Sequence, residues 1–212
     1  MADWSTYGVL GLVSGPALIA LGGSMARCAP LSWGRVSRSD LPAMLASGAL
    51  LSITLVQVAE RRPESAGAVV WLVIVGLLLA LIDWIGHRLP HRIVGVLLSG
   101  GLVQFGLSGL VQRNAEPLLR ASVAAVAVFA IGLVIYMRSS GLGGGDVTLS
   151  TTMAFFLGWF SWRHVVLGLI LALVLAALAC LALSALRGVQ RRQPIALGPA
   201  LVFGSVCVIL QA

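Results

Sequence analysis

The chain has 212 residues, of which 59% are hydrophobic and only 10% charged, and its mean hydropathy is +1.02. A water-soluble globular domain is nearer one quarter charged, so this chain has too little polar surface to be one. The net charge of +7 comes from arginines alone, and because these are spread along the chain we expect no nucleic-acid partner.

Apolar runs separated by short polar breaks predict an all-α fold, a polytopic bundle of transmembrane helices in a lipid bilayer. We count about eight spans, within a range of six to eight, near residues 7–26, 41–59, 67–84, 90–111, 117–137, 147–161, 164–186 and 194–211. No repeat or linker divides the chain. We therefore expect a single membrane domain over residues 1–212, with the functional core at about 67–212.

The arginines predict the orientation of the bundle. With the N-terminus outside, nine arginines fall in inner breaks and five in outer breaks, and cytoplasmic loops are the ones enriched in such residues. The five outer arginines are accompanied by Glu60, Glu64 and Glu116. This bias predicts a multi-pass protein whose even-numbered breaks face outward.

Cysteine and histidine spacing predicts no metal site and no bound cofactor. Cys28, Cys180 and Cys207 are far apart and form no CxxC pair. His87 and His91 are four residues apart, but Pro90 interrupts a continuous helix between them and no acid completes an HExxH pattern. His164 is far from both in the sequence, at the edge of another predicted span.

Two of the seven acidic residues have no ordinary explanation. Asp83 ends the apolar run in the string LIDWIGHRLP, at a helix C-terminus where the helix dipole disfavours a negative charge. A plain alternative is an interfacial ion pair with His87 or Arg88. Acids so close to the hydrocarbon are otherwise candidates for function.

Asp146 follows three glycines, Gly143, Gly144 and Gly145, in the string GLGGGDVTLS. Asp is a good helix N-cap and glycines are common in loops, so a structural role is a strong alternative here. Three consecutive residues without Cβ also allow unusual dihedral angles and a close approach by another chain. In the predicted topology Asp83 and Asp146 fall on the cytoplasmic side at similar depth. Two carboxylates in a site of low dielectric share a proton, so that one acts as base and the other as acid.

These motifs resemble those of the type IV prepilin peptidase family, membrane aspartic proteases of the GxGD type. Gly143 to Asp146 match the GxGD motif, and Asp83 followed by basic residues and Leu89-Pro90 matches the first aspartate motif. The stretch from Pro194 to Pro199 matches a Pro-apolar-x-x-Gly-Pro region, and the opening string GLVSGPALIALGGSMARCAP is similar to the first helix of the family.

The resemblance implies an aspartic endopeptidase of the bacterial inner membrane. Its catalytic residues would be Asp83 and Asp146, its substrate loop Gly143, Gly144 and Gly145, and its partner a pilin-like precursor whose leader it cuts at the cytoplasmic face. Methyltransferase activity is not expected, because only 31–40 occupy the place of the cysteine-rich region of long members. Thr148 stands where the family often has lysine, and His91 where it has asparagine or aspartate.

Other functions remain open on the sequence alone. A small proton-coupled transporter or an assembly factor could use the same two acids, although it would need them nearer mid-depth. A GxGD intramembrane protease with another substrate would share the catalytic pair. The identity of the precursor and the oligomeric state are not predicted.

Overall fold

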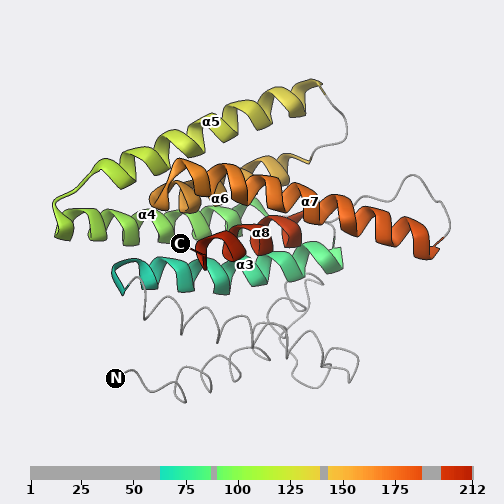
Figure 1. Ribbon diagram of the computed structural model, residues 1–212, viewed down its shortest axis with the longest axis horizontal. Helices are drawn as coiled ribbons and strands as arrows, with labels where there is room; N and C mark the ends of the chain where they lie inside the picture. Colours follow the sequence, from blue (N-terminus) through green and yellow to red (C-terminus); the bar gives the residue numbers. More distant parts are fainter. Residues whose placement is uncertain (1–62, 87–89, 139–142, 188–196, 212) are drawn as a thin grey trace, which may run out of the picture.

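The computed structural model describes residues 63–86, 90–138, 143–187 and 197–211, and all regular structure in these ranges is helical (Figure 1). The elements are η3 (Pro63–Ser65), α3 (Ala66–Gly86), α4 (His91–Gln112), α5 (Glu116–Arg138), α6 (Gly144–Phe160), α7 (Trp162–Arg187) and α8 (Gly198–Ile209). The all-α prediction is confirmed for this part of the chain. The first two predicted spans, 7–26 and 41–59, lie outside the described residues.

Four described helices are long and apolar enough to cross a membrane. These spans are Ala66–Trp84, His91–Gln112, Glu116–Arg138 and Trp162–Ala182. The other two helices, α6 and α8, have 17 and 12 residues. The structure thus has the helices of a multi-pass membrane protein, whereas the total of eight spans stays a prediction.

Helices α3, α4, α6 and α8 meet in a shared core, with α5 and α7 packed on its outside. Phe105 of α4 stacks on Trp159 of α6 with the ring centroids 4.4 Å apart, and Val202 of α8 is fully buried. Glycines allow close helix contacts: a Cβ at Gly101 of α4 would lie 2.4 Å from the ring of Phe156. This core fixes how the ends of the helices lie relative to one another.

The outer helices expose apolar side chains, as lipid-facing helices do. Val126 of α5 is 68% exposed and Leu173 of α7 is 65% exposed, although both are large and hydrophobic. In water such faces would mark an interaction site, but on helices of spanning length they are the surface expected to contact lipid.

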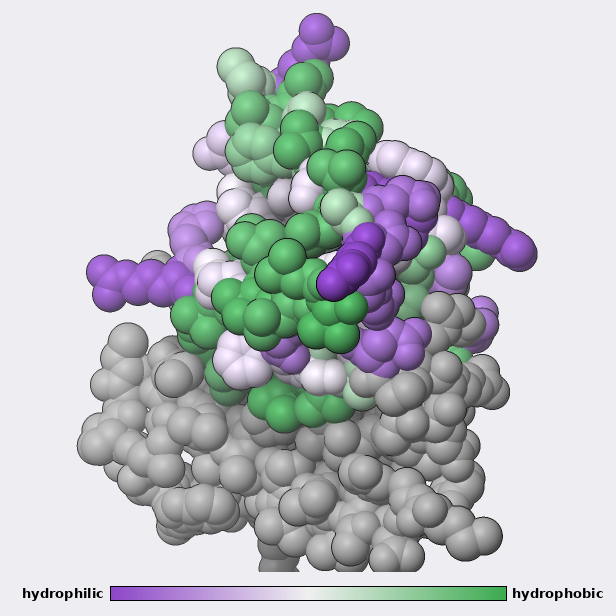
Figure 2. Space-filling model, turned by 90° about the vertical axis from the view of Figure 1, so that its left-hand side faces the viewer, coloured by the Kyte–Doolittle hydropathy of each residue, from purple (hydrophilic) through white to green (hydrophobic). Residues whose placement is uncertain are grey.

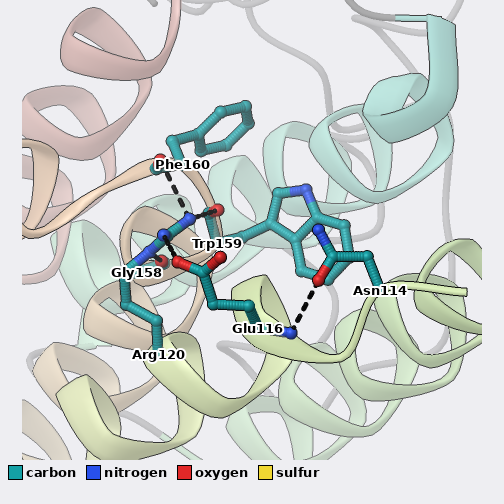
Figure 3. A network of polar contacts seen from close by, with 6 residues as sticks. All are labelled: Asn114, Glu116, Arg120, Gly158, Trp159 and Phe160. Carbon is teal, nitrogen blue, oxygen red and sulfur yellow. Dashed lines mark hydrogen bonds and ion pairs between the residues drawn. The ribbon is translucent and has the colours of Figure 1, made fainter. Parts of the chain in front are cut away.

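Consecutive helices run in opposite directions, so their ends gather at the two ends of the bundle (Figure 1). The chain turns from α4 to α5 at one end, on the left in Figure 1, where hydrophilic side chains lie beside apolar ones (Figure 2). Arg120 of α5 closes this end: its guanidinium donates to the carbonyl oxygens of Gly158, Trp159 and Phe160 at 2.8, 2.7 and 3.1 Å (Figure 3). It therefore supplies the C-terminus of α6 with the donors that the helix itself lacks.

Candidate active site

Helix ends also gather at the other end of the bundle, on the right in Figure 1. Helix α3 finishes there, and α4, α6 and α8 all begin there. The three helix N-termini present backbone N–H groups and the positive ends of helix dipoles, which favour negative charge. Both predicted catalytic acids belong to this group of helix ends, Asp83 at the finish of α3 and Asp146 at the start of α6.

Asp83 is buried in the last turn of α3, with only 5% of its surface exposed. Its Oδ2 accepts a hydrogen bond of 2.8 Å from the backbone N–H of Gly198, the first residue of α8. The dipole of α3 disfavours an anion at this point, and the N-terminus of α8 offsets that effect. The sequence offered His87 or Arg88 as an alternative ion-pair partner, and both lie outside the described residues.

Asp146 lies in the first turn of α6, outside the four spans of membrane length. Its Oδ2 accepts a hydrogen bond of 3.3 Å from the N–H of Gly143, three residues earlier. Burial raises the pKa of the Asp146 carboxyl group, the charge of Asp83 raises it as well, and the bond from Gly143 lowers it. Asp83 and Asp146 are therefore within electrostatic reach of each other.

The glycine run is less of a loop than its sequence indicates. Gly143 is the residue before α6, in an extended conformation at φ −75° and ψ 143°, while Gly144 and Gly145 form the first turn of the helix. A Cβ at Gly143 would lie 3.0 Å from Oδ2 of Asp146, whereas one at Gly144 would meet only the ring of Tyr136 at 4.0 Å. At Gly143 the close neighbour is thus Asp146 itself.

The two residues at which the chain departs from the resembled motifs lie side by side. The hydroxyl of Thr148 is 3.5 Å from Nδ1 of His91, and it donates a bond of 2.9 Å to the carbonyl oxygen of Gly145. These residues come from α6 and α4, 57 positions apart. The sequence singled out both positions but gave no sign that they meet.

No candidate metal centre occurs among the described residues, because no three His, Cys, Asp or Glu side chains group together there. His164 lies at the start of α7, at the opposite end from His91, and its Nδ1 is 2.6 Å from the hydroxyl of Ser161. The chemistry available at the end that holds Asp83 and Asp146 is that of two unlike carboxyl groups. Asp83 is buried against the N-terminus of α8, and Asp146 holds its proton more tightly than an ordinary aspartate because its pKa is raised.

The sequence did not predict the role of Gly198. The string from Pro194 to Pro199 was noticed as a motif, but the contact to Asp83 joins residues 115 positions apart. The signal in the sequence was a Gly-Pro pair opening an apolar run, which predicts a helix start and carries no information about its neighbour.

The model of the type IV leader peptidase family matches residues 70–185, which is more than half of the chain and extends from α3 to α7. No curated protein and no solved structure gives a significant match. The matched region includes Asp83 and Asp146 and ends before α8. The chain belongs to the type IV leader peptidase family.

Proposed function

We propose that this protein is an aspartic endopeptidase that cuts the leader peptide from type IV pilin-like precursors, with Asp83 and Asp146 as the catalytic pair. The observation that carries the proposal is the electrostatic coupling of the two acids, one of them buried at a helix N-terminus, at one end of the bundle. Family membership supports peptidase activity.

The unlike surroundings of the two acids support a division of labour. An ionised carboxylate removes a proton from water as the water attacks the peptide carbonyl, and a protonated carboxyl group supplies a proton to the other side of the reacting bond. The net reaction adds one water across the peptide bond, so no other reactant is required. A transporter would need the acids near the middle of the membrane, and both lie at helix ends.

The substrate fits the position of the acids at the end of apolar helices. A precursor with a basic leader followed by an apolar helix could place that helix in the bilayer and its leader junction beside Asp83 and Asp146. The arginine distribution favours the cytoplasm for this end of the bundle, and family membership favours a bacterial inner membrane for the protein. Gly143 to Gly145 would then lie beside the bound leader.

The test is cleavage of a pilin-like precursor by membranes that contain the wild type, Asp83→Asn or Asp146→Asn. Each amide is nearly the size of the acid but cannot exchange the proton, so we expect both variants to accumulate normally and cleave at least about 100-fold more slowly. Glu64→Gln is the control, because it removes an exposed carboxylate at the opposite end. Normal trimming by an abundant Asp146→Asn protein would contradict the proposal. The mass of the product should also show an unmethylated N-terminus.

A further inference from the structure

The first residue of α8 makes a short backbone hydrogen bond to one of the two acids. The N–H of Gly198 donates to Oδ2 of Asp83 at 2.8 Å, and both residues are buried. The corresponding bond at Asp146, from Gly143, is 3.3 Å long. A short bond from a helix N-terminus stabilises a carboxylate more than it stabilises the neutral acid.

The sequence at the start of α8 makes this donor hard to replace. Pro199 has no backbone N–H, and the N–H of Leu201 already bonds to the carbonyl oxygen of Leu197. A Cβ at position 198 would lie 2.7 Å from Oδ2 and 3.1 Å from Cβ of Asp83. Only glycine lets the backbone come this close without displacing the carboxylate.

We propose that Gly198 is a positioning residue that holds Asp83 ionised as the base of the pair and leaves the shared proton on Asp146. This inference rests on the proposed peptidase function and extends it to a residue outside the part of the chain that matches the family model. It assigns different roles to two acids that the sequence alone treats as equivalent.

Several other ionisable groups lie at this end of the bundle in the part of the chain that the structure describes. Within Gly198–Ile209 the only titratable side chain is Cys207. The neighbouring described helices bring to this end Asp146 on α6, His91 and Arg92 on α4, and Tyr136 and Arg138 on α5. The hydrogen bond from Gly198 to Asp83 links α8 directly to one of the two acids.

The first test follows the Gly198 amide signal by NMR in detergent-solubilised protein labelled with ¹⁵N-glycine. The signal is identified by its loss in Gly198→Ala, or by sequential assignment from Leu197 if that variant does not fold. We expect its chemical shift to change with pH in the wild type and to stay constant in Asp83→Asn. A shift that never changes with pH, or that changes equally in both proteins, overturns the assignment. This measurement does not depend on peptidase activity.

The second test is kinetic and compares Gly198→Ala with Gly76→Ala. The control adds a Cβ to the same interface between α3 and α8, 3.0 Å from a methyl group of Val202 and away from the carboxylate. Misplacing a catalytic group by about 1 Å costs on the order of 100-fold, so kcat of Gly198→Ala should fall by about that factor with KM little changed.

The acid side of the pH profile of kcat distinguishes a residue that positions the carboxyl group of Asp83 from one that only packs α8 against α3. In Gly198→Ala this acid side should be displaced from its wild-type position, because the carboxyl group of Asp83 has lost its hydrogen bond from the backbone of α8. In Gly76→Ala it should stay in place. Equal losses of kcat with unchanged profiles in both variants overturn the positioning role. If the amide titrates as expected but the wild type cleaves no precursor, the proposed function fails and the contact between Gly198 and Asp83 stands.

Discussion

The carboxyl group of Asp146 is subject to opposing influences. Burial and the charge of Asp83 favour its neutral form, and the N–H of Gly143 favours its ionised form, with a net rise in its pKa. The folded protein therefore binds this proton more tightly than the unfolded chain does. The contribution of the Asp146 carboxyl group to the free energy of unfolding is fully present below the pKa that this group has in the unfolded chain. It is lost as the pH rises through the higher pKa that the group has in the folded protein.

This linkage predicts a stabilising substitution. Asp146→Asn removes the unfavourable ionisation but keeps an oxygen that can accept from Gly143, so it should raise the thermal unfolding temperature at neutral pH. The gain should shrink toward zero below about pH 4, where Asp146 is protonated in both states. Thermal unfolding in detergent at several pH values measures it. A wild type that is the more stable protein at neutral pH would contradict the cause given for the raised pKa.

The glycines before Asp146 should differ in sensitivity. Gly143→Ala places a methyl group 3.0 Å from Oδ2 of Asp146 and should slow cleavage by about tenfold, equivalent to about 1.4 kcal/mol in the barrier. Gly144→Ala meets only Tyr136 at 4.0 Å and should be nearly neutral. Rates normalised to membrane abundance test the pair, and equal rates for the two variants would remove Gly143 from the site.

At the residue scale the sequence predicted candidates but not contacts. Asp83 and Asp146 stood out because every other acid had an ordinary explanation in a break or at a terminus. The contact of Asp83 with Gly198 could not be predicted, because Gly198 is 115 residues away. It donates through its backbone N–H, a group that every residue except proline has. The contact between the side chains of His91 and Thr148 could not be predicted either, because the two residues are 57 positions apart on different helices.

Among the elements, helix types were predictable and helix ends less so. The predicted sixth span began at residue 147, whereas α6 begins at Gly144, because the glycines continue the helix. The predicted last span began at residue 194, whereas α8 begins at Gly198, with Pro199 at a position where proline favours a helix start. Hydropathy locates an apolar run but does not say where backbone hydrogen bonds begin.

The C-terminus of α6 should depend on Arg120. Arg120→Ala leaves three carbonyl oxygens without their donor and should cost about 2–3 kcal/mol of stability, the range for hydrogen bonds to charged groups. Arg163→Ala is the control, since it removes an exposed arginine at the same end of the bundle. Thermal or denaturant unfolding of both variants measures the difference, and equal stabilities would mean that the cap contributes little.

The C-terminus of α4 offers a stabilising change. Arg113 has a left-handed backbone, with φ 51° and ψ 33°, and its N–H bonds to the carbonyl oxygen of Leu110. Glycine adopts this conformation without the strain of a side chain, so Arg113→Gly should raise stability by about 1 kcal/mol. Arg113→Ala keeps the strain and serves as the control in the same unfolding experiment. A loss of stability in the glycine variant would mean that the arginine side chain contributes more than its strain costs.

At the scale of the whole molecule, the alternating helices place the end closed by Arg120 opposite the end that holds the two acids (Figure 1). Composition alone predicted a membrane bundle, and the apolar helices of the described part confirm it. The single domain over residues 1–212 and the eight spans stay predictions, because the first two predicted spans lie outside the described residues.

Orientation in the membrane can be measured with introduced cysteines. Ala115→Cys lies in the turn between α4 and α5, and Arg138→Cys lies at the end of α5 on the side of the acids. In intact cells a membrane-impermeant thiol reagent should label Ala115→Cys strongly and Arg138→Cys only after the inner membrane is opened, each compared with the wild-type background. The reverse pattern would place the acids outside the cytoplasm.

The central claim, that Asp83 and Asp146 act as one catalytic unit, is tested most directly by the cleavage rate of the double variant Asp83→Asn/Asp146→Asn. Residues that act as a unit are strongly non-additive, so the double variant should retain the same residual rate as either single variant. A double variant slower than both by the product of the two single effects would show that the acids contribute independently, and would contradict a shared dyad.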